Sequence, residues 1–225
     1  RLTSLSGLWQ MDAESMHAHE LKLTTPYSII ALDADVDNMA LDEQQSEGRM
    51  HVILDAEVGR QDLFLGVGPT MAAELQDVYP DRNLTARMNL TGNMQHLQLA
   101  DTYLYLQDAL TANLEGTVDF PTDDAKRGGS ITLDVQSHNL DFLLPLLNLK
   151  DFTIPHGMIA QGTATIEGTR YSYDGIIRQN RGLLQMKGAY DTQNDSYLAD
   201  LHLDSLNIND FMPKDSIYYF SGDVA

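Results

Sequence analysis

Cysteine is absent from the 225-residue sequence, tryptophan occurs once, and no long apolar run is present. The absence of cysteine excludes disulfides and thiolate metal sites, and it fits a bacterial protein that crosses an oxidising compartment. No stretch approaches the roughly 18 apolar residues of a membrane-spanning helix, and no signal peptide is visible. The chain opens on Arg1 and stops at residues 221–225, inside an expected strand. We therefore expect a piece of a longer polypeptide, with targeting signals and anchors outside it.

Basic residues are scarce: 14 lysines and arginines stand against 33 aspartates and glutamates, which gives a formal charge of −19. This excess of negative charge repels phosphate backbones and anionic lipid headgroups. The acidic residues are spread through the chain rather than massed in a tail, which indicates a solvated outer face. We therefore expect no nucleic acid among the partners.

Motifs that carry a catalytic mechanism are also missing. The sequence has no Gly-x-Ser-x-Gly elbow, no Walker loop and no His-Glu-x-x-His pair. Its spaced glycines Gly157, Gly162 and Gly168 fall among alternating strand residues, where bends or close backbone approach explain them. We predict that the protein is not an enzyme and has no catalytic residue.

An acidic stretch at residues 33–38 (DADVDN) is a candidate calcium loop. An EF-hand loop, however, requires glycine where Asn38 stands and glutamate where Gln44 stands. The aspartates of this stretch also alternate with apolar residues at strand spacing. We interpret them as the acidic, solvent-facing side of a strand.

His17 and His19 present two imidazoles on one face of an expected strand and are a candidate zinc pair. A zinc site needs a third and usually a fourth ligand, and no residue supplies one at a recognised spacing. His138 and His202 lie at non-equivalent positions of the repeat described below. We therefore interpret His17 and His19 as solvated histidines, expect no repeated ligand role for His138 and His202, and predict no metal and no cofactor.

A period-two alternation of apolar and polar residues dominates the rest of the chain, most clearly in residues 110–120 (LTANLEGTVDF). Because successive side chains on a strand point to opposite faces, each such run makes one polar and one apolar face. Regular turn signals between the runs predict an all-β fold of antiparallel hairpins. The expected strands are residues 27–37, 49–58, 62–66, 84–91, 94–106, 110–120, 130–136, 158–167, 171–178, 182–190 and 197–206.

Three segments interrupt the alternation. Residues 70–77 predict a short helix that ends before Pro80, and residues 140–147 and 208–213 predict helical turns. Within the strand at 94–106 the apolar parity changes at Ala100-Asp101. A bulge there would return the same face to the interior.

An internal repeat links two of these segments, because residues 130–145 align with residues 198–213 at an offset of 68. Self-similarity at a fixed spacing indicates a stacked architecture in which each unit buries its face against its neighbours. We divide the chain into a first segment of strands, residues 1–129, and a second that contains the repeat, residues 130–225.

The residues leave two architectures open. One is a closed β-sandwich, and the other is an extended antiparallel sheet curled into an open hydrophobic groove. The apolar positions mix large aliphatic side chains with small residues such as Ala34, Ala112 and Gly188, and the only tryptophan is Trp9. Fatty acyl chains filling an open groove would gain about 0.8 kcal/mol per buried methylene.

Two phrases resemble TamB and AsmA-like proteins. Residues 21–28 (LKLTTPYS), followed by an alternating strand, resemble a strand, Thr-Pro-x-Ser, strand phrase of that family. Residues 203–216 (LDSLNINDFMPKDS) are similar to Bacteroidetes-type TamB proteins, in which a strand ends in a short turn with leucine, asparagine, phenylalanine and proline. The chain matches neither the N-terminal anchor nor the C-terminal domain of the family.

The resemblance implies a periplasmic segment of an inner-membrane-anchored protein. Such proteins form a β-taco, a sheet folded into an apolar groove, and are implicated in phospholipid transport to the outer membrane. The implied partners are phospholipid acyl chains and an outer-membrane β-barrel protein, with membrane contact through parts outside this chain. The residues expected to line the groove are Leu32, Ala34, Val36, Val52, Leu54, Leu84, Met88, Leu90, Leu110, Leu114, Val118, Leu133, Leu201 and Leu203.

Two other functions remain open. A closed sandwich would suit a glycan-binding or adhesion module, with Tyr103, Tyr105, Tyr171 and Tyr173 as an aromatic platform. A scaffold for outer-membrane protein assembly would instead pair its sheet edge with unfolded strands by β-augmentation. The closed sandwich predicts a filled core. The scaffold predicts that binding depends more on the backbone groups at the sheet edge than on the apolar face.

Overall fold

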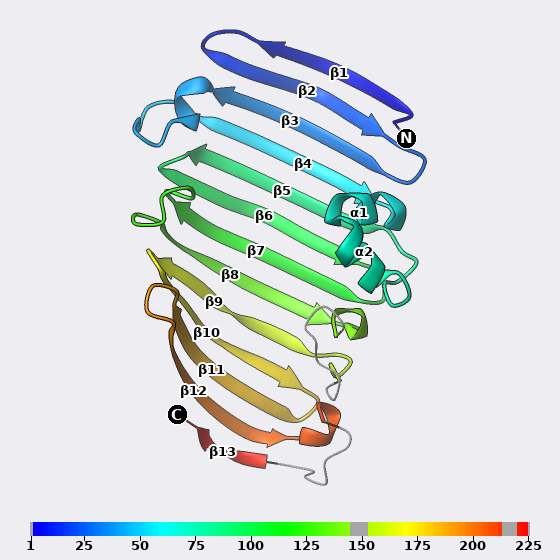
Figure 1. The fold of residues 1–225 in the computed structure, drawn as a ribbon, viewed down its shortest axis with the longest axis vertical. Helices are drawn as coiled ribbons and strands as arrows, with labels where there is room; N and C mark the ends of the chain where they lie inside the picture. Colours follow the sequence, from blue (N-terminus) through cyan, green and yellow to red (C-terminus); the bar gives the residue numbers. More distant parts are fainter. Residues whose placement is uncertain (1, 145–152, 213–219, 225) are drawn as a thin grey trace.

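The computed structural model describes residues 2–144, 153–212 and 220–224. They form one antiparallel sheet in which 13 strands follow one another in chain order (Figure 1). The sheet is open: its first and last strands do not pair. The strands are β1 Ser4–Met11, β2 Ser15–Thr24, β3 Ile29–Asp37, β4 Met50–Val58, β5 Leu84–Asn93, β6 His96–Leu106, β7 Leu110–Asp119, β8 Gly128–Ser137, β9 Ile159–Glu167, β10 Arg170–Gln179, β11 Gly182–Asp191, β12 Ser196–Leu206 and β13 Phe220–Val224.

This architecture confirms the all-β, antiparallel prediction and corrects the sandwich alternative, because the described residues contain no second sheet to cover the first. The alternation explains the result, since each run supplies one apolar and one polar face to a continuous meander. The strand expected at 94–106 changes parity as predicted. Its register shifts between Leu99 and Thr102, where Asp101 takes a φ of 47°.

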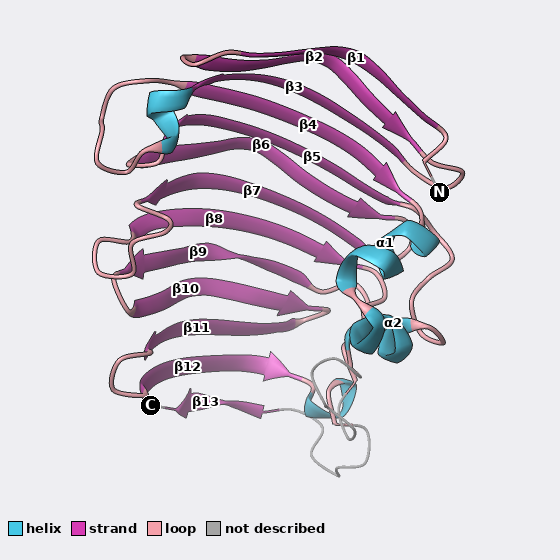
Figure 2. Ribbon diagram, turned by 45° about the horizontal axis from the view of Figure 1, so that its top comes forward, coloured by secondary structure: helices cyan, strands magenta, loops and turns pink. Residues whose placement is uncertain are grey.

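Short helical elements gather at the two ends of the strands (Figure 2). The helices α1 (Arg60–Val67) and α2 (Pro69–Leu75) follow β4, and α2 confirms the helix expected near residues 70–77. Three short 3-10 turns, η1 (Asn38–Leu41), η2 (Asp141–Leu143) and η3 (Ile208–Asp210), follow β3, β8 and β12. No helix among the described residues is long and apolar enough to span a bilayer.

The strand expected at residues 62–66 is wrong, because these residues lie in α1. Leu63 and Phe64 both pack against the cluster around Tyr79. Adjacent residues of a strand point to opposite faces, so only the helix lets both side chains reach one cluster. Asp62 in the first turn also accepts hydrogen bonds from the Thr25 and Ser28 hydroxyls, which ties the helix to the β2–β3 turn.

Two hydrophobic clusters lie at opposite ends of the strands on the apolar face. The helix-side cluster consists of Leu75, Tyr79, Leu106, Ala109 and Phe142, with Leu63, Phe64, Leu84, Leu110, Leu140 and Leu143 packed against it. The η1-side cluster consists of Val36, Ala40 and Met50, with Met16, Ala34, Val52, Leu90, Met94 and Leu97 packed against it. Most of the buried large side chains belong to these clusters. The middle of the apolar face, between the two clusters, is only half-buried.

The repeat appears as two strand-and-turn units. β8 with η2 and β12 with η3 begin 68 residues apart, at Gly128 and Ser196, and each strand ends in a 3-10 turn. The helical turns expected at 140–147 and 208–213 are confirmed where the structure describes them, while residues 145–147 and 213 lie outside that part. The division at residue 129 stays a prediction.

Candidate functional site

The strand register builds a continuous apolar strip across the sheet. In an antiparallel sheet, residues that pair across strands share a face. The central lane of the strip runs through Leu21, Leu32, Leu54, Met88, Thr102, Leu114, Leu133, Gly162, Gly175, Met186 and Leu201, crossing from β5 to β6 at the bulge.

One lane flanks the central lane on each side, two residues away along each strand, or three where the bulges of β2 and β6 add a residue. The lane toward the η1-side cluster is Trp9, Ala18, Ala34, Val52, Leu90, Leu99, Gly116, Ile131, Ala164, Tyr173, Gly188 and Ala199. The lane toward the helix-side cluster is Leu5, Leu23, Ile30, Ala56, Ala86, Leu104, Ala112, Val135, Ala160, Ile177, Leu184 and Leu203. Trp9, Thr102 and Tyr173 are the members of the three lanes with polar side-chain atoms, and no member is charged.

The apolar strip is partly exposed rather than buried. Every residue of the central lane is half-buried, and none of them belongs to either hydrophobic cluster. By contrast, Leu106 at the helix-side end is only 2% exposed. A closed core would bury the middle of its sheet most deeply. Here the ends are buried and the middle is open to an apolar ligand.

All 14 residues expected to line the groove lie on this face. Ten belong to the apolar strip, while Val36, Val118, Leu84 and Leu110 occupy the outermost rows. All are half-buried except Val36, which η1 covers to 7% exposure. Neither β1 nor β2 is among the strands expected from the alternation, and Leu5 and Trp9 of β1 extend the strip.

The length of the strip distinguishes it from a pocket. Neighbouring strands are about 4.8 Å apart, so 12 strands carry the lanes over about 50 Å. An acyl chain reaches across half of a hydrocarbon core of about 30 Å, or about 15 Å. The strip is therefore several acyl chains long and has no charged group that would fix a ligand at one position.

A glycine pair flattens the strip in its second half. Gly162 and Gly175 face each other across β9 and β10, and the hydroxyl end of Tyr173 lies over both. A Cβ added at Gly175 would stand 2.3 Å from that hydroxyl oxygen. The hydroxyl lies 3.4 Å from the Gln161 carbonyl oxygen, its acceptor, and burial raises the Tyr173 pKa.

The tyrosines do not form one platform. Tyr103 and Tyr105 stack with ring centroids 6.2 Å apart, and their register places them on the polar face, opposite Asn113 and Thr111. Tyr171 and Tyr173 pair with Ile166 and Ala164 and therefore lie on the apolar face. The aromatic surface expected for glycan binding is thus divided between the two faces.

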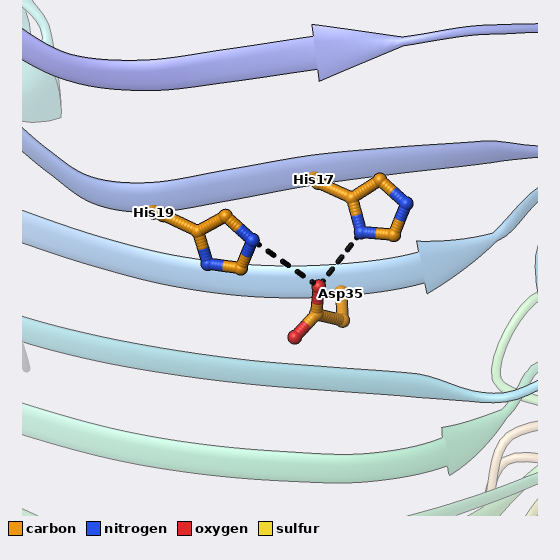
Figure 3. Close-up of side chains that lie close together, drawn as sticks. All are labelled: His17, His19 and Asp35. Atoms are coloured by element: carbon orange, nitrogen blue, oxygen red, sulfur yellow. Dashed lines mark hydrogen bonds and ion pairs between the residues drawn. The ribbon is translucent and has the colours of Figure 1, made fainter.

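The polar face brings together residues that the sequence keeps apart. His17 and His19 of β2 converge on Asp35 of β3, as Figure 3 shows. The His17 Nδ1 atom lies 2.7 Å and the His19 Nε2 atom 3.8 Å from the Asp35 Oδ1 atom. The hydrogen bond from His17 holds the pKa of Asp35 below its ordinary value. The sequence alone does not show that these histidines and the aspartate are neighbours, because their contact depends on the β2–β3 register.

Comparisons with models of protein families, with curated proteins and with solved structures find no match. The resemblance to TamB and AsmA-like proteins is therefore carried by the two sequence phrases alone.

Proposed function

We propose that this chain is a segment of a TamB/AsmA-like lipid conduit in the periplasm, along which phospholipid acyl chains move between the inner and outer membranes. The observation that carries the proposal is the uncharged, largely apolar strip that crosses 12 strands and whose central lane is half-buried. The full-length protein would be anchored in the inner membrane, with an outer-membrane β-barrel protein as its far partner.

The chemistry of the strip suits movement better than retention. Contacts between aliphatic side chains and methylene groups are non-directional and individually weak. An acyl chain can therefore shift from one strand to the next without breaking a specific bond. The acidic charges lie on the opposite face, so anionic headgroups would stay in the water beside the strip rather than bind the protein.

The first experiment is native mass spectrometry with lipid extraction, on protein purified from the envelope of its host. We expect phospholipid to accompany the wild-type protein. Leu114→Asp places a charge in the central lane and should abolish the bound lipid, because burying an unpaired charge among acyl chains is costly. Thr111→Asp is the matched control. It adds the same charge to the same strand on the polar face, opposite Tyr105 and Gln136, and should leave the lipid bound.

Lipid-free wild-type protein, or equal lipid loss in Leu114→Asp and Thr111→Asp, would contradict the conduit. If that protein instead bound unfolded outer-membrane strands, assembly by β-augmentation would become the better proposal.

A further inference from the structure

The polar face carries a cluster with the composition of a metal site. One ligand atom each from His17, His19 and Asp35 lies within 4.8 Å of the others. No other group of three histidine, aspartate or glutamate residues in residues 2–144, 153–212 and 220–224 comes together in this way. The cluster lies on the opposite face from the apolar strip, so it is independent of the proposed lipid path.

The spacing of the ligand atoms suits a tetrahedral ion. Zinc bonds to nitrogen and oxygen are about 2.0–2.2 Å, which separates two tetrahedral ligands by roughly 3.3–3.5 Å. The two distances to the Asp35 Oδ1 atom, 2.7 Å and 3.8 Å, lie on either side of that value. Small side-chain rotations would equalise them without moving the strands.

An outer hydrogen bond already orients one of the imidazoles. The Nε2 atom of His17 lies 2.9 Å from the Ser15 hydroxyl oxygen. Metal-binding histidines almost always donate their second ring N–H to an oxygen, which fixes the tautomer that leaves the other nitrogen free for the ion. In the metal-free protein the Nδ1 N–H of His17 donates to Asp35, so a zinc ion would replace this proton, and the Nε2 N–H would then donate to the Ser15 hydroxyl.

The backbone also positions His19. Directly after it, β2 bulges at Glu20, whose φ is 49°, and the β2–β3 register shifts between Ala18 and Leu21. Bulges often redirect a side chain at a functional site. His51 on β4 pairs directly with Asp35, which places a third imidazole next to the carboxylate.

We propose that His17, His19 and Asp35 bind a Zn²⁺ ion that bridges β2 and β3, with its remaining coordination open to water or to His51. Two imidazoles and one carboxylate match the nitrogen and oxygen ligands of zinc, whereas Ca²⁺ and Mg²⁺ prefer oxygen ligands throughout. The exposed position leaves the ion accessible from solvent, and the acidic surface of β3 favours a cation there.

The test is calorimetric titration of untagged, metal-free protein with Zn²⁺, with Ca²⁺ as the comparison ion. We expect one saturable zinc site per chain and none for calcium. Loss of a residue that hydrogen-bonds to a metal ligand typically weakens metal binding about 10- to 100-fold. His17→Ala, His19→Ala and Asp35→Asn each remove a ligand itself and should weaken zinc binding by more than this. Ser15→Ala removes such a hydrogen-bonding residue and should fall within this range.

His96→Ala is the matched control. His96 also contacts a cross-strand aspartate on the polar face, with its Nδ1 atom 2.5 Å from Asp119 Oδ1, but no third histidine, aspartate or glutamate of the described residues joins this pair in a cluster. Its removal should leave the affinity unchanged, and zinc should shift the imidazole NMR signals of His17 and His19 but not those of His96. Unsaturable binding, or equal affinity in the wild-type protein and the His17→Ala/His19→Ala double variant, would overturn the proposal. Circular dichroism of each variant shows whether the sheet is retained.

Discussion

Phe142 of η2 packs edge-on against Tyr79, with ring centroids 5.4 Å apart and ring planes inclined by 76°. Phe64 of α1 also packs edge-on against Tyr79, with ring centroids 5.8 Å apart and ring planes inclined by 72°. Phe142, which is distant in the chain, thus joins Phe64 and Tyr79 in one aromatic group at the helix-side end of the strands. Such pairs contribute about 0.5–1.5 kcal/mol beyond the area they bury.

Phe142→Ala should therefore destabilise the protein strongly. Phe142 is 8% exposed, and truncation of a buried phenylalanine typically costs about 3–5 kcal/mol. The measurement is urea unfolding followed by circular dichroism. Tyr197→Ala is the control, because Tyr197 is 85% exposed and its loss should change stability by about 0.5 kcal/mol or less. Equal effects of the two substitutions would show that the aromatic group does not hold the helices on the sheet.

A second prediction separates the open middle of the face from its covered end. Leu106→Asp should prevent folding, because this side chain is 2% exposed and a buried, unpaired charge costs several kcal/mol. Leu114→Asp should leave the protein folded, because the aspartate can reach water from its half-buried position. Far-UV circular dichroism and size-exclusion chromatography measure both outcomes. Unfolding of Leu114→Asp would indicate a covered apolar face.

The alternation was sufficient to predict the sheet and the face on which each groove residue lies. Parity alone decides that face, so even the bulge at Asp101 could be inferred from a change of parity. The helix at Arg60–Val67 could not be inferred from the alternation, because Leu63 and Leu65 alternate as in a strand. Only packing against Tyr79 and Phe142 favours the helix.

The cluster of His17, His19 and Asp35 on the polar face could not be predicted from the sequence for a related reason. His17 and Asp35 are 18 residues apart, and their contact depends on which residue of β3 pairs with which residue of β2. The bulge at Glu20 shifts that pairing. The apolar parity changes there, from Met16 and Ala18 to Leu21 and Leu23, but a change of parity does not say which residue of β3 each residue of β2 pairs with. Local periodicity therefore predicts faces, while contacts between strands require the register.

A third prediction concerns acid stability. Hydrogen bonds from the hydroxyls of Ser28 and Thr25 lower the pKa of Asp62 below its ordinary value of 3.8. Because the folded state favours the carboxylate, its stabilising effect is fully present above pH 3.8 and is lost as the pH falls through the lower folded-state pKa.

Asp62→Asn should therefore lower the Tm at neutral pH, and the difference from the wild-type protein should shrink on acidification below pH 3.8. Thermal unfolding across a pH series measures this. Glu74→Gln, on the exposed surface of α2, is the control and should give a small, pH-independent difference. A difference for Asp62→Asn that stays constant through this range would contradict the role of the carboxylate.

The glycine pair under Tyr173 gives the fourth prediction. A Cβ at Gly175 would meet the Tyr173 hydroxyl at 2.3 Å and the Gln161 carbonyl oxygen, part of the neighbouring backbone, at 2.5 Å. Gly175→Ala should therefore force β9 and β10 apart and lower the free energy of unfolding by about 1–3 kcal/mol, the usual range for overpacking.

Gly66→Ala is the opposite case, because a Cβ at this position of α1 has nothing within 4 Å. It should stabilise the protein by about 0.4–1 kcal/mol, since alanine has less backbone freedom to lose on folding. Urea unfolding of both variants measures whether each substitution raises or lowers the free energy of unfolding. Stabilisation by Gly175→Ala would mean that the tyrosine does not lie over the glycine pair and that this part of the strip has room for larger side chains.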